Sequence, residues 1–259
     1  MVKKIVGTGV LLVLALALQA GVKMYTLKSP DGKVKLEVTA GQGIAYSLFY
    51  DGRLLLKPSR IALHTDLPEA DHWENIRITG TKQRHVSETV QAPFYRVKEF
   101  GIDCNELELR LNNGFSLLMR AYNDGMAYRF VAGRKGEMTV VEERAEFNFA
   151  DDFEAYIPYS TNPKDPWNMA FQNFYTKAPL TQYNTELPAF LPLTVDAGAV
   201  KLTLLESDLE AYPGMFVCGD GKTPALKGVF AAYPQETFKN KWRCQETVKT
   251  RRPYIARVA

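Results

Sequence analysis

The stretch ELELRLNNGFSLLMRAYNDGMAYRFV, residues 106–131, decides the fold class of this chain. Its first part alternates apolar and charged residues, and a period of two is typical of a half-buried β-strand. The alternating residues are Leu107, Leu109 and Leu111 against Glu106, Glu108 and Arg110. The dipeptides Asn113-Gly114 and Asp124-Gly125 then separate two further runs, and both tolerate the positive φ of tight hairpin turns. The stretch predicts three consecutive antiparallel strands.

The same pattern extends outward along the chain. A second alternating run follows the turn dipeptide Asp31-Gly32, and another turn dipeptide, Asp51-Gly52, lies beyond it. This run alternates Val34, Leu36 and Val38 with Lys35 and Glu37. Helical periodicity is nearly absent, and many strands at this spacing are typical of a sandwich or barrel. The sequence therefore predicts an all-β fold.

Two segments break this rhythm. Residues 156–180 are rich in proline and aromatic residues, and a loop of this length is too long for a simple connection. Residues 207–214 begin with Ser207, which suits a helix N-terminus, and end at Pro213-Gly214. We expect one helical turn in this second segment.

The N-terminus has the features of a secretory signal peptide. Two lysines precede an apolar stretch over residues 5–18, and a small-residue cleavage site follows at Gln19-Ala20. The apolar stretch is shorter than the ~20 residues that a bilayer requires, so we expect no membrane span. No repeat or linker divides the rest. We therefore predict a leader of residues 1–20 and a single secreted, periplasmic domain over residues 21–259.

Charge and cysteine content argue against two classes of function. The formal net charge is +3 and falls to +1 without the two lysines of the leader, which does not favour a nucleic-acid or anionic-membrane partner. The cysteines Cys104, Cys218 and Cys244 lack CxxC spacing, so we expect no cysteine metal site. Two interpretations stay open, a disulfide between Cys218 and Cys244 and three buried thiols.

The usual catalytic motifs are missing from the sequence. The histidines His64, His72 and His85 lack zinc-ligand spacing, and neither a GxSxG motif nor a phosphate-binding glycine loop occurs. The paired acids Glu142-Glu143 and Asp151-Asp152 are adjacent, so in a strand they point to opposite faces and cannot flank one glycosidic bond. We interpret both pairs as solvated strand edges and turns and expect no self-contained catalytic site.

Two groups of residues remain as candidate binding sites. Trp167 and Tyr159, with Phe174 and Tyr175, could form a platform on which a sugar ring stacks. The alternative is that these rings pack the long loop against the sandwich or against a neighbouring domain. Glu186 lies in a polar stretch before an apolar strand, where its carboxylate could ligate a hard cation such as calcium. For Glu186 the alternative is a solvated charge.

An ordered set of phrases spans residues 29–257. The phrases are SPDGKVKLEV, YSLFYDGRLLLKPS, PFYRVKEF, RAYNDGMAYRF, VVEERAEFNF, FQNFYTKAPL, LPAFLPLTV, ESDLEAYPGMF and TRRPYIAR. In this order they resemble the N-terminal domain of the glycoside hydrolase family 97 α-glycosidases. The resemblance implies a β-supersandwich similar to galactose mutarotases, packed against a (β/α)8 barrel that carries the catalytic carboxylates on loops we do not expect in this chain.

The resemblance also implies a metal ion. Family members are associated with calcium near the active site, and the position that matches the glutamate lent by the N-terminal domain is Glu186. The remaining ligands belong to the barrel. Because calcium takes six to eight oxygen ligands, Glu186 alone should bind it weakly.

Three functions follow as hypotheses. The leading one is the non-catalytic N-terminal domain of a secreted family 97 α-glycosidase that hydrolyses an α-glucoside or α-galactoside, in which this domain buttresses the barrel. The second is a stand-alone carbohydrate-binding module that uses Trp167. The third is an aldose mutarotase, which the confinement of all histidines between His64 and His85 disfavours. Without a barrel, parts of residues 156–180, Glu186 and Tyr254-Ile255 should form an exposed surface that favours homo-oligomers.

Overall fold

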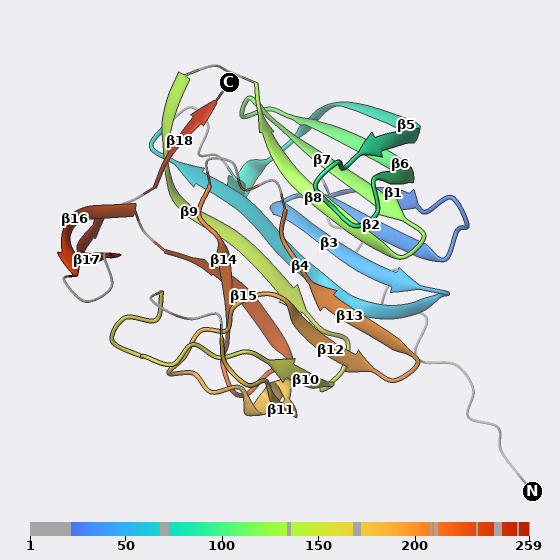
Figure 1. Ribbon diagram of the computed structural model, residues 1–259. Coiled ribbons are helices and arrows are strands. Elements are labelled where there is room, and N and C mark those ends of the chain that lie inside the picture. Colours follow the sequence, from blue (N-terminus) through green and yellow to red (C-terminus); the bar gives the residue numbers. More distant parts are fainter. Residues whose placement is uncertain are drawn as a thin grey trace, which may run out of the picture.

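The computed structural model describes residues 22–67, 73–133, 136–167, 172–207, 209, 212–231, 233–240, 245–252 and 254–258. These residues form four antiparallel sheets, and the helices among them are two short 3₁₀ turns (Figure 1). The turns are η2 (Trp73–Asn75) and η3 (Leu180–Gln182). The all-β prediction is confirmed, and the described residues contain none of the alternating β/α units of a barrel. The predicted leader, residues 1–20, lies outside the described residues.

The largest sheet has eight strands in the order β1-β2-β3-β4-β9-β15-β14, with β18 also paired to β9. They are β1 (Lys23–Lys28), β2 (Val34–Gly41), β3 (Gly43–Tyr50), β4 (Arg53–Thr65), β9 (Gly136–Asn148), β14 (Met215–Gly219), β15 (Ala225–Phe230) and β18 (Tyr254–Val258). Asp51 and Gly52 join β3 to β4 with φ angles of 48° and 78°, the two positive values of a type I′ turn. The structure does not describe the side chains of β18. The expected exposure of Tyr254-Ile255 therefore stays a prediction.

A four-stranded sheet contains the stretch that predicted the fold. It has the order β5-β6-β7-β8 and consists of β5 (Ile78–Gln91), β6 (Glu99–Leu111), β7 (Phe115–Tyr122) and β8 (Gly125–Ala132). The three consecutive strands predicted over residues 106–131 are confirmed. One detail differs from the expectation: Gly125 begins β8 without a positive φ, so this turn does not use the conformational freedom of its glycine.

This sheet packs on the β1 to β4 part of the large sheet (Figure 1). Leu107 and Leu109 of β6 are buried in the same apolar cluster as Leu36 of β2, as the period of two predicts. The rings of Tyr46 on β3 and Tyr128 on β8 meet across the interface with centroids 5.9 Å apart. The result is a face-to-face β-sandwich.

The opposite face of β6 carries a buried charge that the sequence pattern did not predict. Glu106 is only 4% exposed, because Arg84 on β5 and Arg120 on β7 lie directly opposite it. Their Nε atoms donate to its two carboxylate oxygens at 2.6 and 2.7 Å. Burial raises the pKa of Glu106, but the two arginines outweigh this and hold that pKa below its usual value.

A second four-stranded sheet, with the order β11-β10-β12-β13, completes the core. Its strands are β10 (Glu154–Ile157), β11 (Thr176–Pro179), β12 (Leu193–Ala197) and β13 (Val200–Leu204), and a separate two-stranded sheet consists of β16 (Tyr233–Asn240) and β17 (Gln245–Arg252). The loop predicted over residues 156–180 overlaps the ends of two paired strands, since residues 156–157 belong to β10 and 176–179 to β11, and the connection between them is residues 158–175. The helical turn predicted over residues 207–214 lies partly outside the described residues.

The β5–β6 hairpin extends beyond its sheet as a two-stranded ribbon. β7 pairs with β6 only as far as Cys104, so among the described strands none pairs with residues 87–101 besides their own hairpin, and these residues are almost all exposed. Phe94 at the ribbon tip is 99% exposed. Within the part of the chain that the structure describes, no helix has the length and apolar character to cross a bilayer.

Candidate functional site

Glu186 lies at the apex of a short turn, residues 184–187, which we call the Glu186 turn. The main-chain N–H of Glu186 donates to Oδ1 of Asn184 at 3.1 Å, and that of Leu187 donates to the Asn184 carbonyl oxygen at 3.4 Å. A side-chain oxygen that accepts from the N–H two residues on is characteristic of an Asx turn. Glu186 is exposed, and no described residue forms a hydrogen bond or ion pair with its carboxylate. The turn therefore presents a free carboxylate to solvent.

Tyr159 fastens this turn to the rest of the fold. Its hydroxyl accepts a hydrogen bond of 2.8 Å from the main-chain N–H of Asn184. Its ring packs edge-on against Tyr183 with centroids 5.0 Å apart. Its carbonyl oxygen accepts from Nδ2 of Asn173 at 2.6 Å, and its main chain bridges to Ala189. Tyr159 thus holds both ends of the segment that carries Glu186.

Tyr183 holds the turn from the other side. Its hydroxyl lies 2.7 Å from the carbonyl oxygen of Val217 and 3.1 Å from that of Leu187, and burial raises its pKa so that it stays a donor. A Cβ at Gly219 would lie 2.7 Å from Cγ of Tyr183, so no larger residue fits there without movement. Gly221, at φ +65°, closes the adjoining β14–β15 connection. Tyr183 and the two glycines beside it therefore hold the Glu186 turn against β14.

The four rings of the predicted platform differ in their contacts and exposure. Trp167 is half-buried and packs edge-on against Phe216 at 4.9 Å, whereas Tyr159 packs against Tyr183. Phe174 is fully exposed, and Tyr175 is 46% exposed with its hydroxyl donating to the Pro192 carbonyl oxygen at 3.1 Å. Trp167 and Tyr159 thus pack against other side chains of the fold, which is the alternative to a sugar-binding platform. Sugar binding by either residue stays a prediction.

The described residues fit calcium only in part. No group of three or more His, Cys, Asp or Glu side chains among them is arranged to hold a metal ion. Calcium takes six to eight oxygen ligands, and the Glu186 turn offers one unpaired carboxylate. The Glu186 turn can therefore supply one carboxylate ligand, and the described acidic, histidine and cysteine side chains do not form a complete site.

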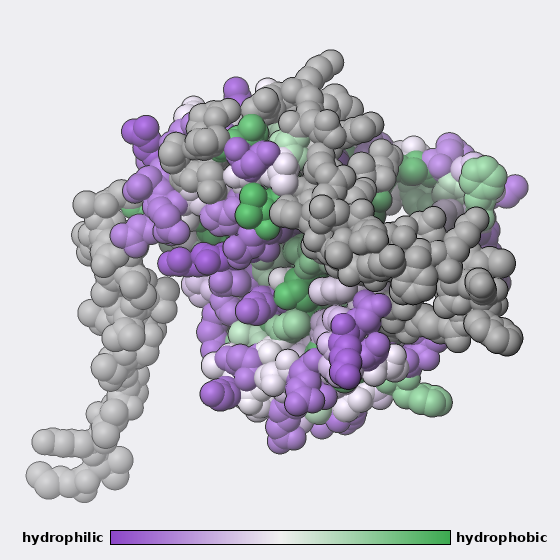
Figure 2. Space-filling model, turned by 90° about the vertical axis from the view of Figure 1, so that its left-hand side faces the viewer, coloured by the Kyte–Doolittle hydropathy of each residue, from purple (hydrophilic) through white to green (hydrophobic). Residues whose placement is uncertain are grey.

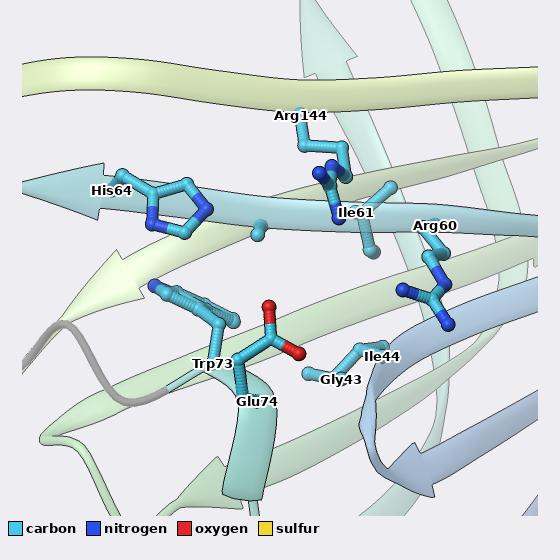
Figure 3. Close-up of a pocket in the computed structure, with 9 residues that line it drawn as sticks. Gly43, Ile44, Arg60, Ile61, His64, Trp73, Glu74 and Arg144 are labelled. Atoms are coloured by element: carbon cyan, nitrogen blue, oxygen red, sulfur yellow. The ribbon is translucent and has the colours of Figure 1, made fainter.

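A small hollow between β4 and η2 contains one of the histidines (Figure 3). Figure 3 shows His64 and Trp73 at one end, Arg60 and Arg144 at the other, and the Glu74 carboxylate pointing between them. The cavity volume of about 10 Å³ is room for about one water molecule. A sugar ring cannot enter it.

The two histidines that the structure describes do not converge on an acid–base site. His64 lies on β4, whereas His85 lies on β5 of the other sheet, exposed and 3.2 Å from the carboxylate of Asp103. His72 lies outside the described residues. A mutarotase requires an acid and a base around one ring, and the two described histidines are not arranged in that way.

One of the paired acids was misinterpreted from the sequence. Glu142, Asp151 and Asp152 are exposed as expected, but Glu143 is half-buried. The β4–β9 register shifts between His64 and Thr65, and such a bulge changes which side chains of β9 face inward. Burial, with the nearby Glu206 carboxylate, raises the pKa of Glu143 to about 7, against the opposing hydrogen bond from Tyr212. Adjacent acids in a regular strand gave no signal of this bulge.

The cysteine prediction is settled only for two residues. Cys104 is a buried thiol and Cys218 is a half-buried thiol. Burial raises the pKa of both, so neither is an activated nucleophile. Cys244 lies outside the described residues, and Cys218, its proposed disulfide partner, is a free thiol in the structure.

Comparisons with known proteins agree with the fold and with the ordered phrases. Residues 27–252 match the family described as Glycosyl-hydrolase 97 N-terminal. The chain is 39% identical over 251 residues to a retaining alpha-galactosidase of Bacteroides thetaiotaomicron, an alignment that covers 94% of this chain and 38% of that protein.

Two solved structures share the fold. One is a glycoside hydrolase family 97 enzyme from Pseudoalteromonas sp. strain K8 in complex with acarbose, with a TM-score of 0.68 and 17% identity over 90% of this chain and 34% of that one. The other is a beta-arabinopyranosidase, with a TM-score of 0.69 and 20% identity over 90% and 39% of the two chains. The chain thus spans well under half the length of these relatives. Since the family match extends over nearly all of the predicted domain, the chain belongs to the glycosyl hydrolase 97 N-terminal family.

Proposed function

We propose that this chain is the non-catalytic N-terminal domain of a secreted, periplasmic family 97 α-glycosidase, and that it lends Glu186 to a calcium site completed by a (β/α)8 barrel. The observation that carries the proposal is the free, exposed carboxylate of Glu186 on a turn that Tyr159 and Tyr183 hold in place. A single carboxylate on a turn that the fold holds in place suits a metal site whose other ligands come from another domain. The alpha-galactosidase relative, of which this chain covers 38%, is long enough to contain such a domain.

The described residues do not favour catalysis by this chain alone. Glycoside hydrolysis requires two carboxyl groups on either side of the scissile bond. Glu143 and Glu206 interact with each other, but Glu143 is bound by the Tyr212 hydroxyl and Glu206 by the Met215 N–H. Both carboxylates therefore serve the fold. We place the chemistry in the barrel.

An exposed aromatic side chain in the loop that contacts Tyr159 supports a docking surface for the barrel. Phe174 is fully exposed, and its neighbour Asn173 is bonded to Tyr159, which in turn contacts the Glu186 turn. On the face that Figure 2 shows, the coloured atoms form small, separate hydrophobic areas among hydrophilic residues. A fully exposed phenylalanine is a side chain of the kind expected at an interface. In the absence of the barrel, we propose that this surface supports homo-oligomers.

Hydrolysis assays test the proposal. Purified residues 21–259, incubated with p-nitrophenyl α-galactoside and α-glucoside in the presence of calcium, should release no p-nitrophenol above the buffer blank. Turnover that stays with the protein through successive purification steps would contradict the non-catalytic role.

A stand-alone carbohydrate-binding module is a second candidate, which the exposed rings of Phe174 and Tyr175 favour. Calorimetric titration with maltooligosaccharides distinguishes it. Saturable binding that Phe174→Ala or Trp167→Ala abolishes would support a carbohydrate-binding function. A titration without heat of binding would rule that function out.

A further inference from the structure

We propose that Tyr159 is a positioning residue for Glu186: its hydroxyl holds the Glu186 turn in the conformation that presents the carboxylate to a cation. The inference rests on the proposed role of Glu186 as a metal ligand and deepens it. It assigns to Tyr159 a role other than sugar stacking.

The hydroxyl of Tyr159 satisfies a main-chain donor that the turn cannot satisfy itself. The N–H groups of Glu186 and Leu187 both donate to atoms of Asn184, within the turn. The N–H of Asn184 donates outward, to the Tyr159 hydroxyl at 2.8 Å. Asn184 is therefore the residue around which the turn closes, and Tyr159 fixes Asn184.

Tyr159 is itself held on three sides. Its ring lies against Tyr183, its carbonyl oxygen accepts from Asn173 at 2.6 Å, and its main chain pairs with Ala189 three residues beyond Glu186. Ala189 in turn exchanges two main-chain hydrogen bonds of 2.8 Å with Val217, at β14. The hydroxyl is thus a fixed point of the core.

A ligand fixed before the metal arrives loses less conformational entropy on binding. Glu186 has a long, exposed side chain, so the main chain beneath it is the part of the ligand that the fold can order in advance. The Tyr159 hydroxyl provides this order without contacting the ion.

The variant Tyr159→Phe removes the hydroxyl and keeps the ring on Tyr183. Tyr175→Phe is the matched control, because its hydroxyl bonds Pro192 outside the turn. Two NMR measurements on residues 21–259 test the inference. The first is the hydrogen-exchange rate of the Asn184 amide. The second is the broadening of the amide signals of residues 184–187 by Mn²⁺, a paramagnetic ion that binds carboxylates and broadens nearby signals even when it binds weakly. In Tyr159→Phe we expect Asn184 to exchange roughly five- to tenfold faster, as the loss of one hydrogen bond predicts, and the broadening to weaken severalfold. Tyr175→Phe should match the wild type in both.

The outcomes separate this inference from the proposed function. Unchanged Asn184 exchange in Tyr159→Phe overturns the positioning role. Glu186→Gln should abolish the Mn²⁺ broadening and leave Asn184 exchange unchanged. If the broadening survives Glu186→Gln, the metal-ligand role fails, while the exchange rate still decides whether Tyr159 holds the turn. Should Tyr159→Phe fail to fold, Asn173→Ala, which frees the Tyr159 carbonyl oxygen, is judged by the same exchange criterion.

Discussion

The hydroxyl of Tyr212 donates a hydrogen bond of 2.5 Å to Oε2 of Glu143. This bond ties the segment after β13 to strand β9 near the edge of the core. The same segment contains Glu206, which accepts from the Met215 N–H at 2.7 Å and adds its charge to the environment of Glu143. Burial, and then the nearby Glu206 charge, disfavour the charged form of Glu143 and raise its pKa. The protonation of Glu143 should therefore couple the stability of the domain to pH.

We predict that the domain loses stability as the pH rises from about 4.5 to 7. The pKa of Glu143 is raised from 4.5 to about 7 in the folded state, so the folded state binds this proton more tightly than the unfolded state. The contribution is complete at low pH, falls as the pH approaches 7 and is lost above it. By linkage, a pKa raised from 4.5 to about 7 corresponds to roughly 3 kcal/mol.

The variant Glu143→Gln mimics the protonated form, so it should flatten this pH dependence and unfold at higher urea concentration than the wild type at pH 8.5. Glu142→Gln is the control, since Glu142 is adjacent but exposed, and it should behave as the wild type. Urea unfolding between pH 5 and 8.5 measures the effect. A wild-type profile in Glu143→Gln would show that this carboxyl does not titrate as described.

Arg120→Ala should destabilise the domain by about 2 kcal/mol, because it leaves the buried Glu106 carboxylate with one partner. Arg110→Ala is the comparison, since Arg110 is exposed and lies 3.9 Å from Glu108. That change should cost less than ~0.5 kcal/mol. Urea denaturation of the two variants compares them, and equal losses would refute the importance of the Glu106 pairing.

Gly219→Ala should lower the stability by about 1–3 kcal/mol, the usual cost of overpacking, because its Cβ would lie 2.7 Å from Cγ of Tyr183. A Cβ at Gly101, on the exposed ribbon, would meet no atom within 4 Å, so Gly101→Ala should be nearly neutral. Thermal unfolding checks both. An unchanged unfolding temperature for Gly219→Ala would contradict the close contact between residue 219 and the Tyr183 ring.

Phe174→Ser should reduce self-association of residues 21–259 without changing the unfolding temperature, because Phe174 is fully exposed and buries nothing within the domain. Sedimentation velocity over a range of concentrations measures the association. A monomer at every concentration before the substitution would count against the proposed docking surface.

The strands of the sandwich could be predicted because they depend on local pattern. Leu107 and Leu109 alternate with charged residues, and the dipeptide Asp51-Gly52 favours a tight turn by itself. Residues adjacent in sequence were therefore sufficient to predict these strands and this turn. The position of Glu186 came from the family resemblance, since a lone glutamate carries no pattern of its own.

The remaining features depend on residues distant in sequence. Glu106 is buried only because register brings Arg84 and Arg120 beside it. Glu143 turns inward only after a bulge in the β4–β9 pairing. The role of Tyr159 depends on an N–H 25 residues further along the chain. No periodicity of the sequence reports these contacts.

The central claim is that this domain belongs to a longer enzyme, and the intact mass of the native, secreted polypeptide tests it most directly. We predict a mass well above the 29.2 kDa of these 259 residues, by at least the ~250 residues of a (β/α)8 barrel. A native mass at or just below 29.2 kDa would contradict the account, because no barrel would then accompany Glu186.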